Sequence, residues 1–351
     1  MDRERTVIVG GGEAGLIAAA HLERASETNV VVVSNSRYHV FSFLLYDVIA
    51  GAPSCRARLN LAHAFRGKDV TFVRDVVEGL DTTENRIDLR SGALHFDTLL
   101  IALGGVTKYD IDDREHVLDV RTDVREIRNG ANAPDIQRIV VVGGGPVGVE
   151  TTATLSSITD DVDVGLISSS RRLLPDFPQR ASRIAERILR RRDVDLRMAA
   201  QVTGVTANDV VLDGATELSD LTVWAGGVRP NPVIENFDLA RSDQGLRVDS
   251  RLRCCGVDDV YAVGDVVDYP GKVTDGYAAG LEARTAAKNV LRELRGRRLK
   301  DLDVRWHPRA VYLGEDTALL TINGLVHCGR SPKLLRDLAI ALYLFYWRRV
   351  Y

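Results

Sequence analysis

Residues 6–15, TVIVGGGEAG, and residues 139–148, IVVVGGGPVG, are two versions of one pattern. Each begins with an apolar, β-branched run of strand length, turns through G-x-G-x-x-G and continues into a stretch that favours a helix. A second apolar run follows each of these helices, at residues 30–33 and 162–167. The chain therefore contains two β-α-β units, and repetition of this kind predicts two related α/β modules.

The three glycines of each fingerprint have different tasks. The first makes the turn, the second lets the backbone approach a pyrophosphate, and the third lets the helix pack on the strand. The helix N-terminus favours the anion through its unpaired N–H groups. Glycine turns also serve packing alone, but two copies in the same context predict two bound dinucleotides, which suits a flavin that receives hydride from a nicotinamide. The glycines are Gly10, Gly12 and Gly15, then Gly143, Gly145 and Gly148.

Composition excludes several classes of protein. The chain has 351 residues, of which 45% are hydrophobic and 27% charged, as expected for about two soluble globular domains. A net charge of −3 provides no cationic field for nucleic acid. The cysteines Cys55, Cys254, Cys255 and Cys328 form no C-x-x-C or C-x₄-C pair, and the seven histidines are dispersed. We therefore expect no disulfide framework and no metal site.

A third cluster lies at residues 257–265, VDDVYAVGD, a predicted strand that ends in Gly264-Asp265 before a predicted helix over 277–292. An acid in this place can accept hydrogen bonds from ribityl hydroxyls, although an Asp that only caps the helix fits as well. Two further strand-to-glycine exits, at 96–105 and 221–230, are predicted to be crossings between domains.

Together these segments resemble the two-dinucleotide flavoproteins of the pyridine nucleotide-disulfide oxidoreductase superfamily. Within it they resemble the type II NADH:quinone oxidoreductases and the ferroptosis-suppressor-like branch. The resemblance covers almost the whole chain and is carried by residues 37–51 (RYHVFSFLLYDVIAG), 96–104 (FDTLLIALG), 224–230 (WAGGVRP), 260–265 and 311–324. It implies FAD as cofactor, NAD(P)H as substrate and a quinone as electron acceptor, with residues 37–51 beside the flavin ring.

The expected fold is α/β, with two Rossmann-like dinucleotide-binding domains, the second inserted in the first. The FAD-binding domain is predicted at 1–118 and 230–296, the NAD(P)-binding domain at 119–229, and a C-terminal region at 297–351. Besides the fingerprint glycines, the resemblance implies that the cofactors contact Glu13, Ala14, Val77, Ala102, Leu103, Gly104, Pro146, Val147, Gly226, Gly227, Gly264 and Asp265.

Two residues are candidates for a direct part in the reaction. Glu150 stands two residues after the third glycine of the second fingerprint, and in relatives the G-x-E acid reaches the nicotinamide; a surface glutamate is the alternative. Tyr277 and Leu281 occupy places where bacterial and fungal quinone reductases carry two Gln, and the ferroptosis-suppressor-like branch has a similar Y-x-A-G-L stretch. Tyr277 is therefore expected near the quinone face of the flavin.

The chain departs from its relatives at the ends of the second strands. Relatives usually place an acid there to hold a ribose, whereas this chain has Ser34 and Ser168. Ser34 and Asn35 can still hydrogen-bond a ribose hydroxyl. At Ser168 the missing carboxylate, with Arg171 and Arg172 close by, suits a 2′-phosphate, so NADPH and NADH are equally expected. A further departure is Phe43, where relatives have Pro.

Three other functions share this pattern. A ferredoxin reductase or another reductase with a soluble acceptor needs both fingerprints and no cysteine. A sulfide:quinone oxidoreductase needs two well-placed cysteines, and neither Cys55 nor Cys328 stands in a recognisable motif. A protein that binds flavin or NAD without turnover would tolerate the missing carboxylates.

The C-terminal stretch 338–347, LAIALYLFYW, contains ten apolar residues flanked by Lys and Arg. That is about half of the roughly 20 residues needed to span a bilayer. Its aromatic and basic content suits a helix at the membrane interface, while a helix docked on the core or across a homodimer is the alternative. With no signal segment at the N-terminus, we expect a cytoplasmic protein, peripheral on the inner face of the cell membrane if this helix binds lipid.

Overall fold

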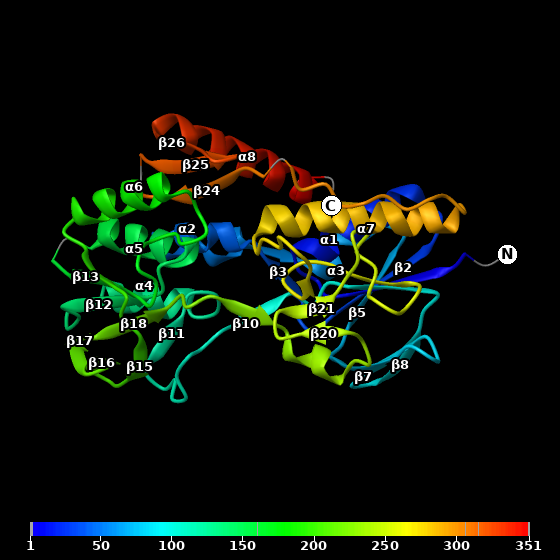
Figure 1. The fold of residues 1–351 in the computed structure, drawn as a ribbon, viewed down its shortest axis with the longest axis horizontal. Helices are drawn as coiled ribbons and strands as arrows, with labels where there is room; N and C mark the ends of the chain where they lie inside the picture. Colours follow the sequence, from blue (N-terminus) through cyan, green and yellow to red (C-terminus); the bar gives the residue numbers. More distant parts are fainter. Residues whose placement is uncertain (1–2, 160, 306, 315, 350–351) are drawn as a thin grey trace.

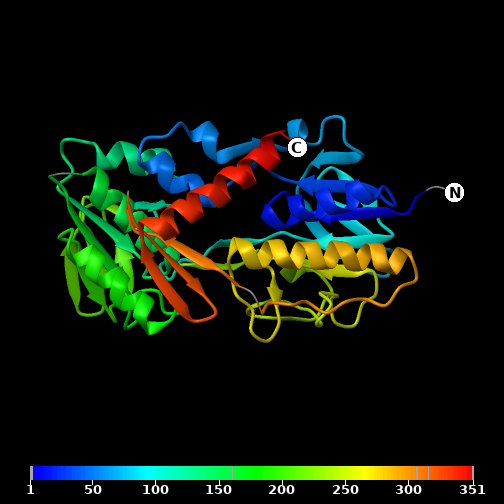
Figure 2. The ribbon, with the colours of Figure 1, turned by 90° about the horizontal axis from the view of Figure 1, so that it is seen from above.

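The computed structural model describes residues 3–159, 161–305, 307–314 and 316–349. Two lobes lie side by side (Figure 1), and the C-terminal helix runs diagonally from one to the other (Figure 2). The first sheet has the order β22-β9-β1-β2-β5 and the second β11-β18-β12-β13-β14, and every pairing in them is parallel. The strands are β1 (Arg5–Val9), β2 (Asn29–Ser34), β5 (Val70–Arg74), β9 (Thr98–Ile101), β22 (Val260–Ala262), β11 (Val117–Asp119), β12 (Arg138–Val142), β13 (Asp163–Ser168), β14 (Asp195–Met198) and β18 (Leu221–Trp224).

The two fingerprints occupy equivalent places in these sheets. β1 and β12 are the central strands, and residues 7–9 and 139–142 are almost completely buried. Parallel sheets are covered on both faces, which explains why these strands are continuous β-branched runs. Helices α1 (Glu13–Ala25) and α7 (Gly276–Leu294) pack in the first lobe, and α5 (Pro146–Ile158) and α6 (Gln179–Arg190) in the second (Figure 1). The predicted α/β fold with two Rossmann-like units is confirmed.

Smaller elements complete the lobes. Each carries an antiparallel sheet, β6-β7-β8 or β15-β16-β17, and an antiparallel pair of β10 and β19 joins the two chain crossings. The strands are β6 (Val77–Asp81), β7 (Arg86–Leu89), β8 (Gly92–His95), β10 (Gly105–Thr107), β15 (Val202–Val205), β16 (Asp209–Leu212), β17 (Ala215–Leu218) and β19 (Val228–Pro230). β11 straddles the expected domain boundary at 118 and pairs in the second sheet, so this sheet begins before the boundary.

The remaining short elements lie around these sheets. They are β3 (Tyr38–Val40), β4 (Arg58–Asn60), β20 (Arg241–Ser242), β21 (Gly245–Arg247), β23 (Val267–Asp268), η1 (Ser42–Leu44), η2 (Ser54–Ala57), η3 (Pro232–Asn236), α2 (Leu45–Ile49), α3 (Leu61–Ala64) and α4 (Val124–Ala131).

The C-terminal region is an antiparallel sheet followed by one long helix. The sheet contains β24 (Arg309–Tyr312), β25 (Ala318–Ile322) and β26 (Leu325–Gly329), and the helix is α8 (Arg330–Arg349). α8 has two contrasting faces. Leu344 and Trp347 are 8% and 1% exposed and belong to the core of the first lobe, whereas Leu342 and Phe345 are 62% and 63% exposed. Among the described residues, no helix is long and apolar enough to cross a bilayer.

Candidate functional site

The first phosphate turn (residues 10–15) and the second phosphate turn (residues 143–148) have the same geometry. Gly10 has φ +121° and Gly143 has φ +130°, a region that disfavours other residues. A Cβ added at Gly10 would lie 2.1 Å from the carbonyl oxygen of Ala102, and one at Gly143 would lie 2.2 Å from that of Ala225. Each first glycine therefore lets the turn pass directly against the neighbouring strand exit.

The other two glycines of each turn have different roles: the third allows close packing, and the second leaves the binding position open. A Cβ at Gly15 would lie 1.9 Å from the oxygen of Gly10, so the third glycine lets the helix close on the turn. Gly12 and Gly145, the N-cap residues of α1 and α5, have nothing within 4 Å of an added Cβ. A glycine N-cap brings no side chain to the first-turn N–H groups, which leaves them available to an anion. Both turns thus fit a dinucleotide pyrophosphate.

The segments after β9 and β18 complete the two turns. Ala102, Leu103 and Gly104 follow β9, and Ala225, Gly226 and Gly227 follow β18, each beside the strand that carries a fingerprint. This is the point where the strand order reverses, and open α/β sheets bind their ligands at the carboxyl ends of the strands there. A Cβ at Gly104 or Gly227 would meet nothing within 4 Å. In each sheet, the phosphate turn and the predicted residues after the neighbouring strand therefore lie together at the carboxyl end of the strands.

Ser34 and Ser168 lie beneath the phosphate turns. Their hydroxyl oxygens accept the backbone N–H groups of Ser36 (3.3 Å) and Ser170 (3.2 Å), and a Cβ at Gly11 or Gly144 would approach those oxygens within 2.9 and 2.5 Å. Both hydroxyls therefore close the turn after their strand. Asn35, beside Ser34, is exposed. Val77, also predicted to contact a cofactor, is buried at the start of β6.

The two arginines after Ser168 have different environments. Arg171 is exposed. The guanidinium of Arg172 donates to the carbonyl oxygens of Phe177 (2.9 Å) and Pro175 and to the hydroxyl of Ser182 (2.5 Å). Arg172 thus organises the loop before α6, because its donors are committed to that loop. Of the two predicted arginines, Arg171 is the one that is exposed.

Asp265 follows β22 of the first sheet and lies next to Gly105. Burial raises the pKa of its carboxyl group, and the positive charges of Lys272 and Arg121 oppose that rise. The residue before it, Gly264, donates its N–H to Glu282 at 2.7 Å. A carboxylate and two nearby cations in this position can hold polyol hydroxyls through charge-assisted hydrogen bonds.

Glu282 is a fully buried residue of α7 that the sequence analysis missed. Its side chain is 0% exposed and also accepts from the Tyr269 hydroxyl (2.7 Å) and the Lys272 ammonium (2.6 Å). A glutamate inside a predicted helix carries no signal of such a role, because its partners come from another part of the chain. Glu282 joins α7 to the Gly264-Asp265 turn.

Glu150 lies where the two lobes and the C-terminal region meet. Its carboxylate accepts the N–H of Tyr312 (2.8 Å) and a hydrogen bond from the hydroxyl of Tyr46 in α2, and the charge of Arg336 in α8 acts on it. Burial raises the pKa of Glu150, against the opposing effects of Arg336 and these hydrogen bonds. The surface-glutamate alternative is wrong, because Glu150 is buried.

Tyr277 stands in the first turn of α7 and is partly exposed. Its ring stacks on that of His307, with 5.5 Å between centroids and 20° between planes. The Nε2 atom of His307 lies 2.9 Å from the carboxylate of Asp275, which caps α7 by accepting the N–H of Ala278. No motif surrounds His307 in the sequence, so its contact with Tyr277 came from the structure alone.

α8 contacts the first phosphate turn directly. The hydroxyl of Tyr343 donates to Glu13, the first residue of α1, and the Nε2 atom of His39 lies 3.5 Å from the same carboxylate. The ring of Phe43 packs edge to face on Tyr343, 5.9 Å between centroids. Phe43 therefore forms part of the surface on which α8 packs. A proline at this position would not provide this aromatic contact.

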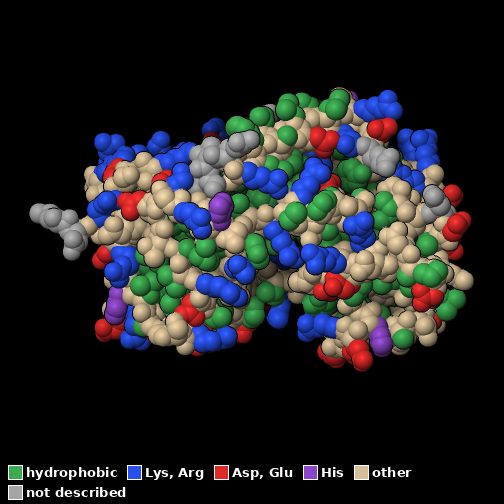
Figure 3. Space-filling view, turned by 180° about the vertical axis from the view of Figure 1, so that it is seen from behind, with side chains coloured by type: hydrophobic (Ala, Val, Ile, Leu, Met, Phe, Trp, Pro, Cys, Tyr) green, Lys and Arg blue, Asp and Glu red, His purple; other side chains and the backbone are tan. Residues whose placement is uncertain are grey.

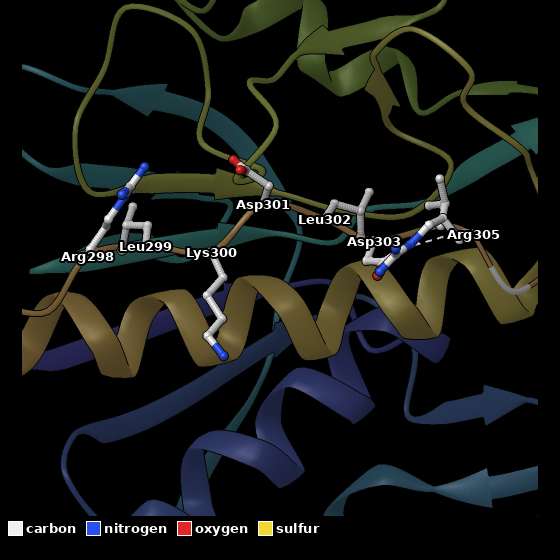
Figure 4. Close-up of a pocket in the computed structure, with 8 residues that line it drawn as sticks. Arg298, Leu299, Lys300, Asp301, Leu302, Asp303 and Arg305 are labelled. Atoms are coloured by element: carbon white, nitrogen blue, oxygen red, sulfur yellow. Dashed lines mark hydrogen bonds and ion pairs between the residues drawn. The ribbon is translucent and has the colours of Figure 1, made fainter.

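A surface hollow elsewhere is lined by one extended segment, residues 298–305, along α7 (Figure 4). Asp303 and Arg305 pair with each other there. Neither phosphate turn contributes to this hollow, so it is not part of the candidate site.

Comparisons with known proteins agree with this geometry. The family model described as pyridine nucleotide-disulphide oxidoreductase matches residues 4–283. The chain belongs to this family. Demethylphylloquinone reductase NdbB of Synechocystis is 28% identical over 98% of this chain and 92% of its own length. Ferroptosis suppressor protein 1 of Xenopus tropicalis is 29% identical over 84% of this chain and 82% of its own length.

Solved structures of low sequence identity share the fold. The sulfide:quinone oxidoreductase of Aquifex aeolicus superimposes with a TM-score of 0.88 at 16% identity, over 99% of this chain and 92% of the other. NDH2 of Plasmodium falciparum in complex with NADH gives a TM-score of 0.85 at 17% identity, over 97% and 94%. In this member of the family all four cysteines are free; Cys254 is buried, whereas Cys55 and Cys255 are exposed.

Proposed function

We propose that this chain is an FAD-dependent NAD(P)H:quinone oxidoreductase. The observation that carries the proposal is the duplication of the phosphate turn: two open turns of the same geometry, one on each lobe. A single chain with two such turns suits two dinucleotides that react with each other. Two relatives support a quinone as acceptor by their names: the demethylphylloquinone reductase of Synechocystis and a type II NADH:quinone oxidoreductase of Mycobacterium tuberculosis.

The first phosphate turn would hold FAD, with Asp265 on its ribityl chain, and the second would hold the nicotinamide nucleotide. When bound, the flavin accepts hydride from NAD(P)H and passes electrons to the quinone. The chain's own residues position these groups. Glu150 lies two residues beyond the second turn and is anchored by Tyr46 of α2, a helix of the predicted FAD-binding segment 1–118. From this place it can orient the nicotinamide side. Tyr277 would face the quinone.

The domain division supports this assignment. A flavin domain made of residues 1–118 and 230–296 would contain the whole first sheet. A nicotinamide domain at 119–229 would contain the second sheet apart from most of β11. The strand pairing favours moving the first boundary to just before Val117. Residues 297–351 would remain a separate C-terminal region.

The outer face of α8, formed by Leu334, Leu338, Leu342 and Phe345, would bind the membrane surface. All four side chains are exposed. In Figure 3 apolar side chains gather along the edge where α8 lies, next to Lys and Arg. An apolar helix face with basic neighbours suits an anionic bilayer. A peripheral position on the inner face of the cell membrane would give access to lipid-soluble quinones; a homodimer through this face is the competing outcome.

Vesicle binding tests the role of this face. Leu342→Ser with Phe345→Ser should abolish sedimentation with vesicles, whereas Leu218→Ser with Leu325→Ser should not, because Leu218 and Leu325 are exposed at other places on the surface. A protein that is dimeric in solution and becomes monomeric in the Leu342/Phe345 variant, with no vesicle binding by the wild type, would identify the homodimer instead.

The reaction itself is tested with purified protein under nitrogen. The protein should be yellow, and NADH or NADPH should bleach it. Addition of a quinone should restore the yellow colour and yield the quinol. Oxidation of the bleached protein by ferredoxin but not by quinone would establish the soluble-acceptor reductase in its place, and a yellow protein that neither nucleotide bleaches would establish a binding protein.

The choice of nucleotide depends on Arg171. If its exposed guanidinium holds a 2′-phosphate, Arg171→Gln should raise the KM for NADPH about tenfold, as expected for the loss of a charge-assisted hydrogen bond of about 1.5 kcal/mol, and leave the KM for NADH unchanged. An equal effect on both nucleotides, or a wild-type preference for NADH above tenfold, would contradict this role.

A further inference from the structure

A hollow of about 290 Å³ lies between α1, α7 and the C-terminal half of α8, apart from both phosphate turns. We call it the α8 hollow. Its walls combine positive charge with aromatic rings: His21, Arg24, Arg284, Tyr343, Tyr346 and Trp347.

Two arginines, Arg24 and Arg284, line the α8 hollow. Within the described part of the chain, neither Arg24 nor Arg284 forms a salt bridge; Arg24 instead lies 5.2 Å from the ring centre of Tyr346. By contrast, Arg295 at the C-terminal end of α7 forms a salt bridge with Glu27. Two arginines without a salt-bridge partner among the described residues, on a concave and partly buried surface, form an arrangement that an anionic group stabilises.

The pKa of His21 is affected by the positive charges around the hollow. Its pKa is lowered by burial and by the charges of Arg284, Lys288 and Arg24. From α8, Tyr343 and Tyr346 face the hollow, and the carboxylates that act on these two tyrosines are Glu13 and Glu23. Glu13 already accepts the hydrogen bond of Tyr343. The charges that act on His21 itself are therefore those of three cations.

Exposed apolar side chains border the hollow along α8. Leu342 and Phe345 precede Tyr343 and Tyr346 by one residue and point to the solvent side of the helix. A ligand with a phosphate in the hollow and hydrocarbon along Leu342 and Phe345 would satisfy both surfaces. A quinone is neutral and would leave the two arginines without a counter-charge.

We propose that the α8 hollow binds the phosphate head group of an anionic membrane phospholipid, whose acyl chains lie along Leu342 and Phe345. The site rests on the proposed docking of α8 on the membrane and names the lipid that α8 selects. It also places the head group next to Tyr343, the residue that links α8 to the first phosphate turn.

The first test measures binding of the flavin-loaded full chain to vesicles of phosphatidylglycerol in phosphatidylcholine, with pure phosphatidylcholine as reference. A cation near an anionic bilayer strengthens binding roughly fivefold, so Arg24→Gln with Arg284→Gln should weaken binding to the anionic vesicles by about 25-fold. The control is Arg66→Gln with Arg247→Gln, which removes the same charge from two exposed arginines on other elements. Equal loss in both variants, or no preference of the wild type for phosphatidylglycerol, would overturn the proposal.

The second test follows His21 by NMR, assigned with His21→Gln. Dihexanoyl-phosphatidylglycerol below its micelle concentration should raise the pKa of His21 in the wild type, because it adds a negative charge beside the imidazole. The same shift with inorganic phosphate at equal concentration would indicate a site for a free anion. Displacement of the lipid by a short-chain quinone would indicate a quinone site. Either result, or no shift with the lipid, would overturn the proposal.

A third measurement separates this inference from the proposed function. Bleaching of the flavin by NAD(P)H and reduction of a water-soluble quinone in lipid-free buffer need no lipid bound in the hollow. Absence of both activities in the wild-type protein would refute the proposed oxidoreductase function. Both activities without any preference for the anionic lipid would refute only the lipid site.

Discussion

Replacing Glu282 by Gln should destabilise the flavin lobe strongly. One carboxylate oxygen of Glu282 accepts the N–H of Gly264 at 2.7 Å, and the other accepts from Tyr269 at 2.7 Å and Lys272 at 2.6 Å. An amide has one oxygen and one NH₂ group. In one orientation the Gln NH₂ group would face the N–H of Gly264, and in the other it would face the ammonium of Lys272. In both, Lys272 would lose its salt-bridge partner.

The magnitude follows from the burial of this cluster. Glu282 is fully buried, and the side chain of Lys272 is only 12% exposed. Removing one partner of a buried ion pair costs about 3–5 kcal/mol. That is a large share of the roughly 5–15 kcal/mol that holds a domain folded. Because Gly264 precedes Asp265, the variant should also bind FAD more weakly.

Urea unfolding of the FAD-loaded protein, followed by flavin fluorescence, measures this loss. The matched control is Glu186→Gln, which breaks an exposed salt bridge with Arg190 on α6 and should cost less than about 1 kcal/mol. Adding Lys272→Met to the Glu282 variant should recover part of the loss, since no unpaired cation remains. A midpoint for Glu282→Gln that equals that of Glu186→Gln would refute the reasoning.

Three further changes test other parts of the site. Gly143→Ala should unfold or distort the second turn, because its Cβ would lie 2.2 Å from a carbonyl oxygen. In Gly145→Ala the new Cβ meets nothing within 4 Å, so this variant should keep the Tm and bind nucleotide more weakly. Calorimetry and nucleotide titration compare the two variants, and equal losses of Tm would contradict the different roles of the two glycines. Burial raises the pKa of Glu150 above its ordinary 4.5, so the stability that this group contributes is present below pH 4.5 and is lost as the pH rises through the pKa of the folded protein. Glu150→Gln should therefore reduce the fall of Tm with rising pH. An unchanged dependence of Tm on pH would show that Glu150 stays ionised. Tyr343→Phe removes the hydrogen-bond donor to Glu13 and leaves that carboxylate free to repel the FAD pyrophosphate. The Kd for FAD, measured by flavin release on dilution, should rise at least about tenfold. An unchanged Kd would show that α8 does not influence the first phosphate turn.

Much of this architecture is predictable from the sequence, because it depends on local rules. The conformation of Gly10 and Gly143 and the tight approach of Gly15 and Gly148 to their own turns are demands that only glycine meets. Continuous β-branched runs form the buried parallel strands on either side of those turns. These features recur at fixed spacing within about 30 residues, which is why two modules can be recognised before any coordinates exist.

The pairings that complete the site are long-range, and tertiary structure alone decided them. Glu282 meets Gly264 across 18 residues, and Tyr343 meets Glu13 across 330. A glutamate in a helix has the same local propensity whether it faces water or a buried lysine, so only packing distinguishes the two environments. α8 shows this most clearly: its ten apolar residues predicted a helix with one buried or membrane-bound surface, but which side chains face the core depended on where α1 and α7 placed that core.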